Sequence, residues 1–334
     1  MGGNRQILVV SRPSGVPGPE HFAIVDGKLP ELLDGQVLIR NQYLSVEPAM
    51  RGWLSDKGNY TEQIPLGSVM RSLAVGRVKD SRSPDYRPGD VVTGWFGWQE
   101  FAAVSPGAII RKCKEVDLPP SLALGVLGLN GVTALLGLEK VGRPHPGDTV
   151  VVSSAAGAVG SAVGQIARRM GCRTVGIAGG PEKVAICIEE FGYDAAVDYR
   201  SAGFRNALAQ ACPRGVNVYF DNTAGPISDE VHGLLALNSR VVVCGTASIE
   251  AWDPAPTGPR LERNILVKRA SVTGFIVLDY LDEFESASQR LAEFVRDRSL
   301  VYREEIMGGM ECCLTSIEDL YAGRNMGKRI IRLH

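Results

Sequence analysis

The sequence predicts an α/β protein with a doubly wound parallel sheet, preceded by a β-rich region. From about Gly147 onward, apolar β-branched runs alternate with stretches of helical pattern, which is typical of a parallel sheet covered by helices. From Gln6 to about Val104 the chain consists mostly of short β-like runs separated by turn residues. At 334 residues the chain is roughly two to three times the common domain size, so the two patterns indicate two domains.

The first third contains four runs with the composition of strands. Residues that suit turns separate the runs, including Asp26-Gly27, Asp34-Gly35 and Pro88-Gly89-Asp90. We expect strands over residues 36–44, 69–78, 91–95 and 100–104. A short strand is also expected near the end of the chain, over residues 328–333.

The alternating region begins with the apolar run Thr149–Val152. A Gly/Ala-rich turn follows, and then the amphipathic stretch Ser161–Met170, which predicts a strand, a loop and a helix. Further strands, each separated by a helix, are expected near residues 174–177, 195–197, 216–220 and 241–244, and a last helix over 281–298.

Composition and charge exclude several classes of protein. With 45 % hydrophobic and 22 % charged residues and a net charge of −1, the chain is neither disordered nor equipped with a basic surface for nucleic acid. The apolar stretch Ser121–Leu138 is interrupted by glycines and predicts a buried segment rather than a membrane span. Because the N-terminus lacks a secretory pattern and the seven cysteines are scattered, we expect a cytoplasmic protein without disulfides.

A candidate phosphate-binding loop follows the strand at 149–152. Ala155, Gly157 and Gly160 occupy the three positions of a G-x-G-x-x-G pattern, with alanine at the first. In such a loop the second glycine lets the backbone approach a pyrophosphate and the third lets the helix pack closely on the strand. Small residues could also serve helix packing alone. The strand before the loop and the helix after it favour dinucleotide binding.

The end of the next strand favours NADPH over NADH. An NAD site usually carries a carboxylate there for the ribose 2′-hydroxyl, whereas this chain has Gly179-Gly180. Lys183 follows at the start of the next helix, and Arg173 and Arg200 are further candidates to lie near a 2′-phosphate. The alternative for Lys183 is a solvated lysine in a first helical turn.

The sequence lacks the ligands of a zinc site. Its four histidines, at 21, 145, 232 and 334, have no cysteine or histidine partner at ligand spacing. We therefore expect no metal.

Several ordered motifs together resemble one family. The chain resembles the zinc-independent medium-chain dehydrogenase/reductases, and within them the leukotriene B4 dehydrogenase, prostaglandin reductase and curcumin reductase-like group. The resemblance covers nearly the whole chain. Its motifs are Leu44–Gly52, Gly131–Ala134 before Gly137-Leu138, Ala155–Ser161 with Gly164–Ala167, Glu182–Val184, Phe220–Asn222, Cys244-Gly245, Gly274–Val277 and Asn325–Lys328.

The resemblance implies a domain organisation and a set of cofactor residues. A GroES-like, β-rich catalytic domain would comprise residues 1–124 and 305–334, and a Rossmann NADP-binding domain residues 125–304. The implied NADP(H) contacts are Ala156, Gly157, Ala158, Val159 and Gly160 at the pyrophosphate, Lys183 and Tyr199 at the 2′-phosphate, and Asn222, Cys244, Gly245, Thr246, Ala247, Ser248, Phe275, Ile276, Val277 and Asn325 along the rest of the cofactor. Simpler roles are open for three of these sites: a helix cap for Asn222, a small buried group for Cys244 and a core strand for Phe275–Val277.

The implied reaction is hydride transfer from NADPH to the β-carbon of an α,β-unsaturated ketone or aldehyde. Negative charge then accumulates on the carbonyl oxygen, which calls for a hydrogen-bond donor. Relatives often carry a tyrosine where this chain has Ala49, and another where it reads Ser248–Trp252. The remaining donors are Tyr60, which is the catalytic candidate, a ribose hydroxyl of the cofactor, or water; the alternative for Tyr60 is a packing role in a loop.

Other readings of the same residues stay open. Zinc-free relatives also reduce quinones, and a protein that binds NADPH without catalysis would keep the same motifs. Arg51 and Trp53 could shape the substrate entrance or lie on a helix surface. The expected partner is a small electrophilic substrate. Family resemblance further implies a homodimer formed through the edge strand Ser271–Val277.

Overall fold

The computed structural model describes residues 3–56, 61–249, 252 and 254–333. The chain forms two compact units. The first unit consists of Met1–Leu124, Glu304–Asn325 and Arg329–His334, and the second of Gly125–Arg303 and Met326–Lys328.

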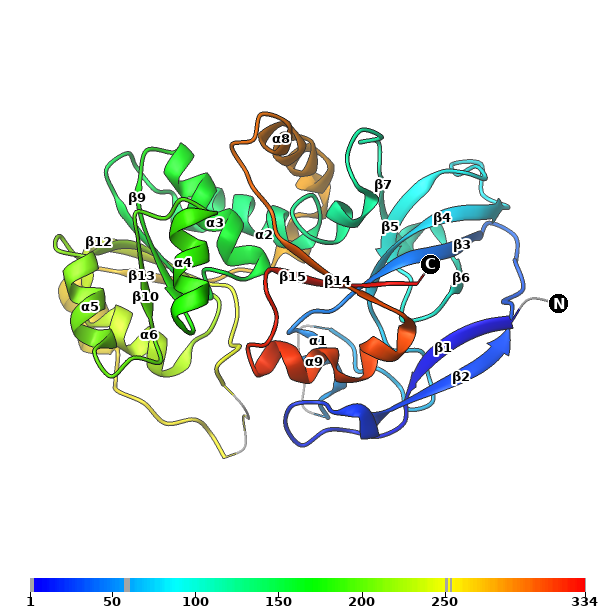
Figure 1. Cartoon of the computed structure of the whole chain (residues 1–334), viewed down its shortest axis with the longest axis horizontal. Coiled ribbons are helices and arrows are strands. Elements are labelled where there is room, and N and C mark those ends of the chain that lie inside the picture. Colours follow the sequence, from blue (N-terminus) through cyan, green and yellow to red (C-terminus); the bar gives the residue numbers. More distant parts are fainter. Residues whose placement is uncertain (1–2, 57–60, 250–251, 253, 334) are drawn as a thin grey trace. The chain divides into compact units, whose positions relative to one another are not determined.

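The second unit is built on a six-stranded parallel sheet with the order β10-β9-β8-β11-β12-β13. Strands β9, β10, β12 and β13 of this sheet are labelled in Figure 1. The strands are β8 (Thr149–Ser153), β9 (Arg173–Ala178), β10 (Ala195–Asp198), β11 (Val216–Asp221), β12 (Leu235–Val243) and β13 (Ser271–Gly274). Strand β8, the first strand of this unit in the sequence, lies in the middle of the sheet. The next strands extend the sheet first to one side and then to the other. This confirms the predicted doubly wound Rossmann sheet.

Helices lie before, between and after these strands in the sequence. They are α2 (Leu129–Gly137), α3 (Ala158–Arg169), α4 (Pro181–Glu189), α5 (Phe204–Ala211), α6 (Gly225–His232), α7 (Glu262–Lys268) and α8 (Phe284–Arg296). Val150, Val151 and Val152 of β8 are fully buried, as expected for a parallel sheet covered on both faces. Helix α2 packs against α3 and α8 and is buried from Asn130 to Gly137, so the apolar stretch over 121–138 is core.

The first unit is mostly antiparallel β structure. A seven-stranded sheet has the order β14-β15-β3-β4-β5-β7, with β6 paired to β3, and β1 and β2 form a separate hairpin. The strands are β1 (Gly3–Val9), β2 (Phe22–Lys28), β3 (Val37–Ser45), β4 (Leu73–Ser81), β5 (Val91–Trp95), β6 (Phe101–Val104), β7 (Ile109–Lys112), β14 (Glu304–Gly308) and β15 (Lys328–Arg332). A β-rich unit in addition to the Rossmann unit agrees with the predicted fold class.

Two local expectations in the first unit are wrong. Asp26-Gly27 was expected to form a turn but lies inside β2, because Gly27 pairs with Asn4 across the hairpin. The expected strand over 69–78 begins only at Leu73. The other two predicted turns are confirmed, since Gly35 and Gly89 adopt positive φ angles of 77° and 97°.

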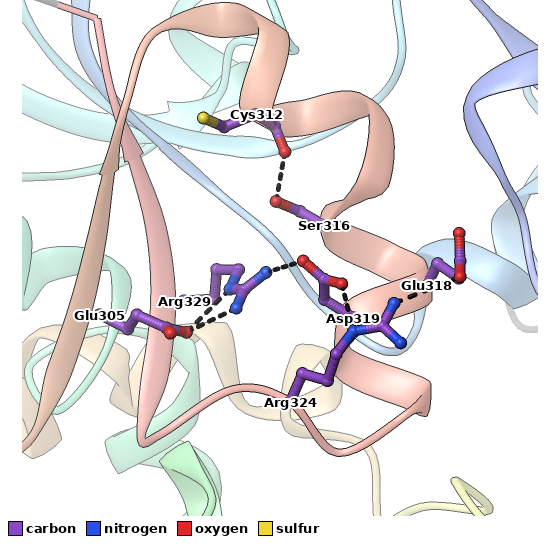
Figure 2. A network of polar contacts seen from close by, with 7 residues as sticks. All are labelled: Glu305, Cys312, Ser316, Glu318, Asp319, Arg324 and Arg329. Carbon is purple, nitrogen blue, oxygen red and sulfur yellow. Dashed lines mark hydrogen bonds and ion pairs between the residues drawn. The ribbon is translucent and has the colours of Figure 1, made fainter.

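Ion pairs around one buried arginine, Arg329, hold the C-terminal segments of the first unit together (Figure 2). Asp319 of helix α9 (Cys313–Tyr321) accepts hydrogen bonds from Arg324 Nε at 2.7 Å and from Arg329 Nη1 of β15 at 2.5 Å. Arg329 also donates from Nε to Glu305 of β14 at 2.9 Å. Because the side chain of Arg329 is only 5 % exposed, its charge depends on these two carboxylates.

Candidate functional site

The predicted cofactor residues of the second unit follow the carboxyl ends of its strands, which lie along one edge of its sheet. All six strands run parallel, so the segments that follow them emerge at the same edge, and the winding direction changes between β8 and β11. In open α/β sheets the crevice at such a switch point is the usual nucleotide site. The predicted residues that follow these strands are Ala156–Gly160, Lys183, Tyr199, Asn222, Cys244–Ser248 and Phe275–Val277.

The loop after β8 depends on glycine at its second and third positions. A Cβ on Gly160 would lie 2.2 Å from the carbonyl oxygen of Ser154, and a Cβ on Gly157 would lie 2.9 Å from Ser154 Oγ. Since real Cβ atoms do not approach backbone oxygens so closely, Gly160 is needed for helix α3 to start this near the strand. The third glycine therefore has the packing role that the pattern predicts.

Alanine at the first position is explained by the neighbouring strand. Ala155 is fully buried, and its methyl group would lie 2.9 Å from a Cβ on Gly176 of β9. Because Gly176 has no side chain, the space beside it accommodates the Ala155 methyl. The departure from the usual first glycine thus leaves the shape of the loop intact.

Helix α3 presents its N-terminus to the loop. Gly157 is the N-cap residue and no side chain caps the helix, so the first backbone N–H groups face the loop without a side-chain partner. Residues 326–328 belong to the same unit, and Gly327 forms a parallel β-bridge with Gly157. Asn325, the residue just before this segment, belongs to the first unit.

The turn after β9 is open and lies beside an aromatic ring. Gly180 has a φ of 91°, and a Cβ on Gly179 would lie 2.8 Å from the ring of Tyr199. Lys183 is the third residue of α4, so its predicted place in a first helical turn is confirmed. Arg173 was a wrong candidate for this region, because it begins β9 at the opposite edge and donates to the carbonyl of Ala211.

Asn222 joins the ends of the two strands at the switch point. Its side-chain amide donates to the carbonyl of Ser153 at 2.7 Å, and its backbone N–H donates to Ser153 Oγ at 2.8 Å. The alternative role as a helix cap is wrong for Asn222. The preceding Asp221 holds that turn, because its carboxylate accepts the N–H groups of Thr223 and Ala224, each at 2.9 Å.

Asp221 is a structural residue that the sequence analysis did not single out. It is 3 % exposed, and its carboxylate also accepts hydrogen bonds from Tyr219 at 3.0 Å and Ser228 at 2.6 Å. The signals in the sequence were its place in the Phe220–Asn222 motif and its position between an apolar strand and a Gly-Pro helix start.

Hydrogen bonds join the loop after β11 to the loop after β12 at this edge of the sheet. The N–H groups of Cys244 and Gly245 both donate to the backbone oxygen of Asp221, at 2.8 and 3.0 Å. Ser248 Oγ lies 2.8 Å from the carbonyls of Thr223 and Ala224. Burial raises the pKa of the Cys244 thiol to about 12, which agrees with a small uncharged side chain at this position.

The last predicted cofactor segment, Phe275–Val277, lies after the end of β13 and is mostly buried. Strand β13 ends at Gly274, so Phe275–Val277 is not the core strand considered as an alternative. Phe275 is 3 % exposed and stacks on Tyr280 with ring centroids 5.4 Å apart. Ile276 is half-buried between buried neighbours.

The residues proposed for substrate chemistry belong to the first unit. Tyr60 lies outside the described residues, so its catalytic role stays a prediction. Ala49 is the N-cap residue of α1 (Met50–Leu54), and Arg51 lies over the ring of Tyr321 at 4.4 Å. Neither role suggested for Trp53 is supported, because it is 2 % exposed and packs edge-on against Trp95.

The residues that the structure describes contain neither a metal-binding cluster nor a membrane-spanning helix. Within these ranges no group of three or more His, Cys, Asp and Glu residues could hold a metal ion. No helix that the structure describes is long and apolar enough to cross a membrane.

Comparison with known proteins assigns the chain to a family. Residues 5–112 match the family described as the N-terminal domain of oxidoreductase, and residues 158–293 match the zinc-binding dehydrogenase family. An NADPH-dependent curcumin reductase of Escherichia coli is 39 % identical to this chain. The match covers 99 % of this chain and 97 % of the length of that reductase. The chain belongs to the zinc-independent medium-chain dehydrogenase/reductases.

Two further relatives place it in the curcumin and alkenal reductase group of this family. An NADP⁺-dependent 2-alkenal reductase of Nicotiana tabacum is 33 % identical over 98 % of this chain and 97 % of its own. The crystal structure of CurA from Vibrio vulnificus in complex with NADPH is 36 % identical, covers 99 % of both chains and has a TM-score of 0.93. The match to that fold extends through both units.

Proposed function

We propose that this protein is an NADPH-dependent reductase of the carbon–carbon double bond in α,β-unsaturated ketones or aldehydes. The observation that carries the proposal is the similarity, over nearly the full chain, to reductases named for curcumin and for 2-alkenals. When bound, NADPH supplies the hydride that adds to the β-carbon of the substrate.

The residues at the sheet edge fit this cofactor. Gly157, at the second position of the loop, has no side chain to keep a pyrophosphate from the backbone, and the N-terminus of α3 attracts that group. Gly160 lets α3 pack close to the strand. At the turn after β9, glycines replace the carboxylate that would repel a 2′-phosphate, and we assign Lys183 and Tyr199 to that group. We propose that Asn222, the 244–248 loop and Phe275–Val277 bind the remaining cofactor. The family resemblance adds Asn325 to the proposed cofactor residues.

The substrate carbonyl oxygen needs a donor as the enolate forms. We propose Tyr60 for this role, with a ribose hydroxyl of the cofactor or water as the alternative donors. Ala49, which stands where relatives often carry a tyrosine, has no donor group in its side chain. A proton from solvent then completes the reduction at the α-carbon.

The function is tested by NADPH and NADH consumption against a linear enone, an alkenal, a quinone and a saturated aldehyde. We expect NADPH oxidation with the enone and the alkenal, and a saturated ketone or aldehyde as product by mass spectrometry. Activity with the quinone alone would replace the proposal by quinone reduction. Cofactor binding without turnover of any substrate would point to a non-catalytic protein.

A homodimer is the assembly that we propose for this chain. Strand β13 pairs with β12 alone among the described strands, and its four residues are exposed. Helix α7 adds Leu266, 78 % exposed, and Val267, 56 % exposed. Burying such groups favours association. Light scattering should give twice the monomer mass, and Leu266→Asp should shift the protein toward monomer; a monomeric wild type would refute the proposal.

For its location we propose the cytoplasm. All seven cysteines are free, which suits a reducing compartment. Cell fractionation tests this, and recovery of the protein from an oxidising compartment would contradict it.

A further inference from the structure

Asp221 is a buried carboxylate at the switch point of the parallel sheet. It is the last residue of β11 and is 3 % exposed. Neutral groups donate all of its hydrogen bonds. The donors are Ser153 Oγ at 3.2 Å, Tyr219 Oη at 3.0 Å, the Thr223 N–H at 2.9 Å, Thr223 Oγ1 at 3.4 Å, the Ala224 N–H at 2.9 Å and Ser228 Oγ at 2.6 Å. An ionised carboxylate only accepts hydrogen bonds, so it suits this set of donors.

No cation pairs with this carboxylate within the ranges that the structure describes. In the same unit, Asp148 is paired with Arg240 at 2.5 Å. The imidazole of His232 packs edge-on against Tyr219, and its Nδ1 lies 2.7 Å from the carbonyl oxygen of Ser228. Its Nε2 is buried without a hydrogen-bond partner among the described residues, so only the proton on Nδ1 has an acceptor. A buried charge without a counterion acts over a longer distance than a surface charge, because water and salt screen it less.

The charge of Asp221 acts on the loop after β12. The N–H groups of Cys244 and Gly245 both donate to the backbone oxygen of Asp221, so the residues lie close together. Burial and, after it, the negative charge of Asp221 raise the pKa of the Cys244 thiol to about 12. Cys244 belongs to the 244–248 loop that we propose for the cofactor. The electrostatic field of the carboxylate therefore reaches the side of the edge that faces the proposed cofactor site.

The strand order indicates which half of the cofactor lies near Asp221. In the proposed use of NADPH, the pyrophosphate lies at the loop after β8 and the 2′-phosphate of the adenosine half at the turn after β9. Strand β11 borders β8 on the side opposite to β9. A dinucleotide bound across β8 in this way has its nicotinamide half toward β11 and β12. The nicotinamide ring is neutral in NADPH and carries one positive charge in NADP⁺.

We infer that the buried carboxylate of Asp221 sets the redox balance of the bound cofactor by favouring the cationic ring of NADP⁺ over the neutral ring of NADPH. This inference rests on the proposed use of NADPH and goes beyond the role of Asp221 in the turn. Hydride transfer moves one hydrogen with its electron pair from the ring to the β-carbon of the substrate and leaves the ring positive. A negative charge that hydrogen bonds already hold in place therefore favours the same step.

The test compares the dissociation constants of NADP⁺ and NADPH, measured by calorimetry, in the wild type and in Asp221→Asn. The amide has the shape of the carboxylate, and the Ser228 hydroxyl can turn to accept from its NH₂ group, so the turn keeps its hydrogen bonds. At an effective dielectric constant of about 20, unit charges roughly 10–15 Å apart change an equilibrium about six- to sixteenfold. We expect Asp221→Asn to raise the ratio of the Kd of NADP⁺ to the Kd of NADPH by about that factor.

Tyr219→Phe is the matched control. It removes one hydrogen bond to the same carboxylate but leaves the charge. A merely structural role for Asp221 would make Asp221→Asn weaken both forms of the cofactor alike. Tyr219→Phe should keep the ratio of the two dissociation constants within about twofold of the wild type, even if both affinities fall. Asp221→Ser also removes the charge and provides the same measurement if the asparagine variant does not fold, which circular dichroism checks.

Two results would overturn the inference: an unchanged ratio in the variants that remove the charge of Asp221, or a rise of the same size in Tyr219→Phe. The proposed reaction fails separately, if the wild type binds both forms of the cofactor but oxidises no NADPH with enones or alkenals. The ratio still decides the role of Asp221 in that case. A wild type that binds neither form would contradict both proposals.

Discussion

Removing the carboxylate of Asp319 should destabilise the first unit strongly. Arg329 is 5 % exposed and bonds to two carboxylates, Asp319 and Glu305 (Figure 2). Breaking a buried ion pair costs about 3–5 kcal/mol when the remaining charge is left without a partner. Here Glu305 stays, 2.8 Å from Arg329 Nη2, and Asp319 itself is 22 % exposed. We therefore expect Asp319→Ala to lower the free energy of unfolding by about 2–3 kcal/mol.

Tryptophan fluorescence during urea unfolding measures this change. Trp53 and Trp98 are 2 % and 0 % exposed in the first unit, whereas Trp252 of the second unit is 57 % exposed. The emission shift on unfolding therefore reports mainly on the first unit. Asp34→Ala provides the control, because Asp34 is fully exposed and its pair with Arg82 lies on the surface of the same unit. That variant should change stability by less than about 0.5 kcal/mol.

The pH dependence of the free energy of unfolding, compared between the wild type and Asp319→Asn, gives a second measurement. Burial raises the pKa of Asp319, but hydrogen bonds from Arg324 and Arg329 and their charges outweigh it and bring the pKa below its usual value of 3.8. A carboxyl whose pKa is lowered by folding stabilises the protein above its unfolded pKa, and this contribution is lost as the pH falls through the folded value. The stability difference between wild type and Asp319→Asn should shrink below pH 3.8. A loss below about 0.5 kcal/mol in Asp319→Ala at pH 7 would refute the reasoning.

Three further substitutions test the site. Gly160→Ala should weaken NADPH binding and lower the free energy of unfolding by about 1–3 kcal/mol, because its Cβ would lie 2.2 Å from the Ser154 carbonyl oxygen. Thermal unfolding and cofactor titration measure these effects. Gly203→Ala is the control, since a Cβ on Gly203 would have no contact under 3.8 Å. Lys183→Ala should weaken NADPH binding by roughly 1–3 kcal/mol with little change for NADH, and an equal loss for both would argue against a 2′-phosphate role. Tyr60→Phe should lower kcat for enones with little effect on cofactor affinity, and unchanged turnover would exclude Tyr60 from the mechanism.

Local patterns in the sequence were enough to predict the sheet of the second unit. The spacing of apolar residues along a segment indicates whether the segment forms a strand or a helix, and this spacing can be seen in neighbouring residues. The alternation of strands and helices could therefore be predicted from the sequence. The loop at 155–160 was predicted in the same way, since its small residues stand at a fixed spacing after a strand. The hairpin of β1 and β2 was not predicted, because Asp26-Gly27 has the composition of a turn, and only pairing with the distant β1 makes it a strand.

By itself, then, the sequence determined the alternating architecture, the phosphate-loop pattern and the absence of an acid at Gly179-Gly180. Only the tertiary structure decided which distant residues complete those features. Gly176 makes room for Ala155, Asp221 orders the turn beside Asn222, and Arg200 lies at the turn while Arg173 lies at the other edge. The physical reason is that periodicity and turn chemistry are local, whereas packing and charge pairing depend on side chains that the fold brings together.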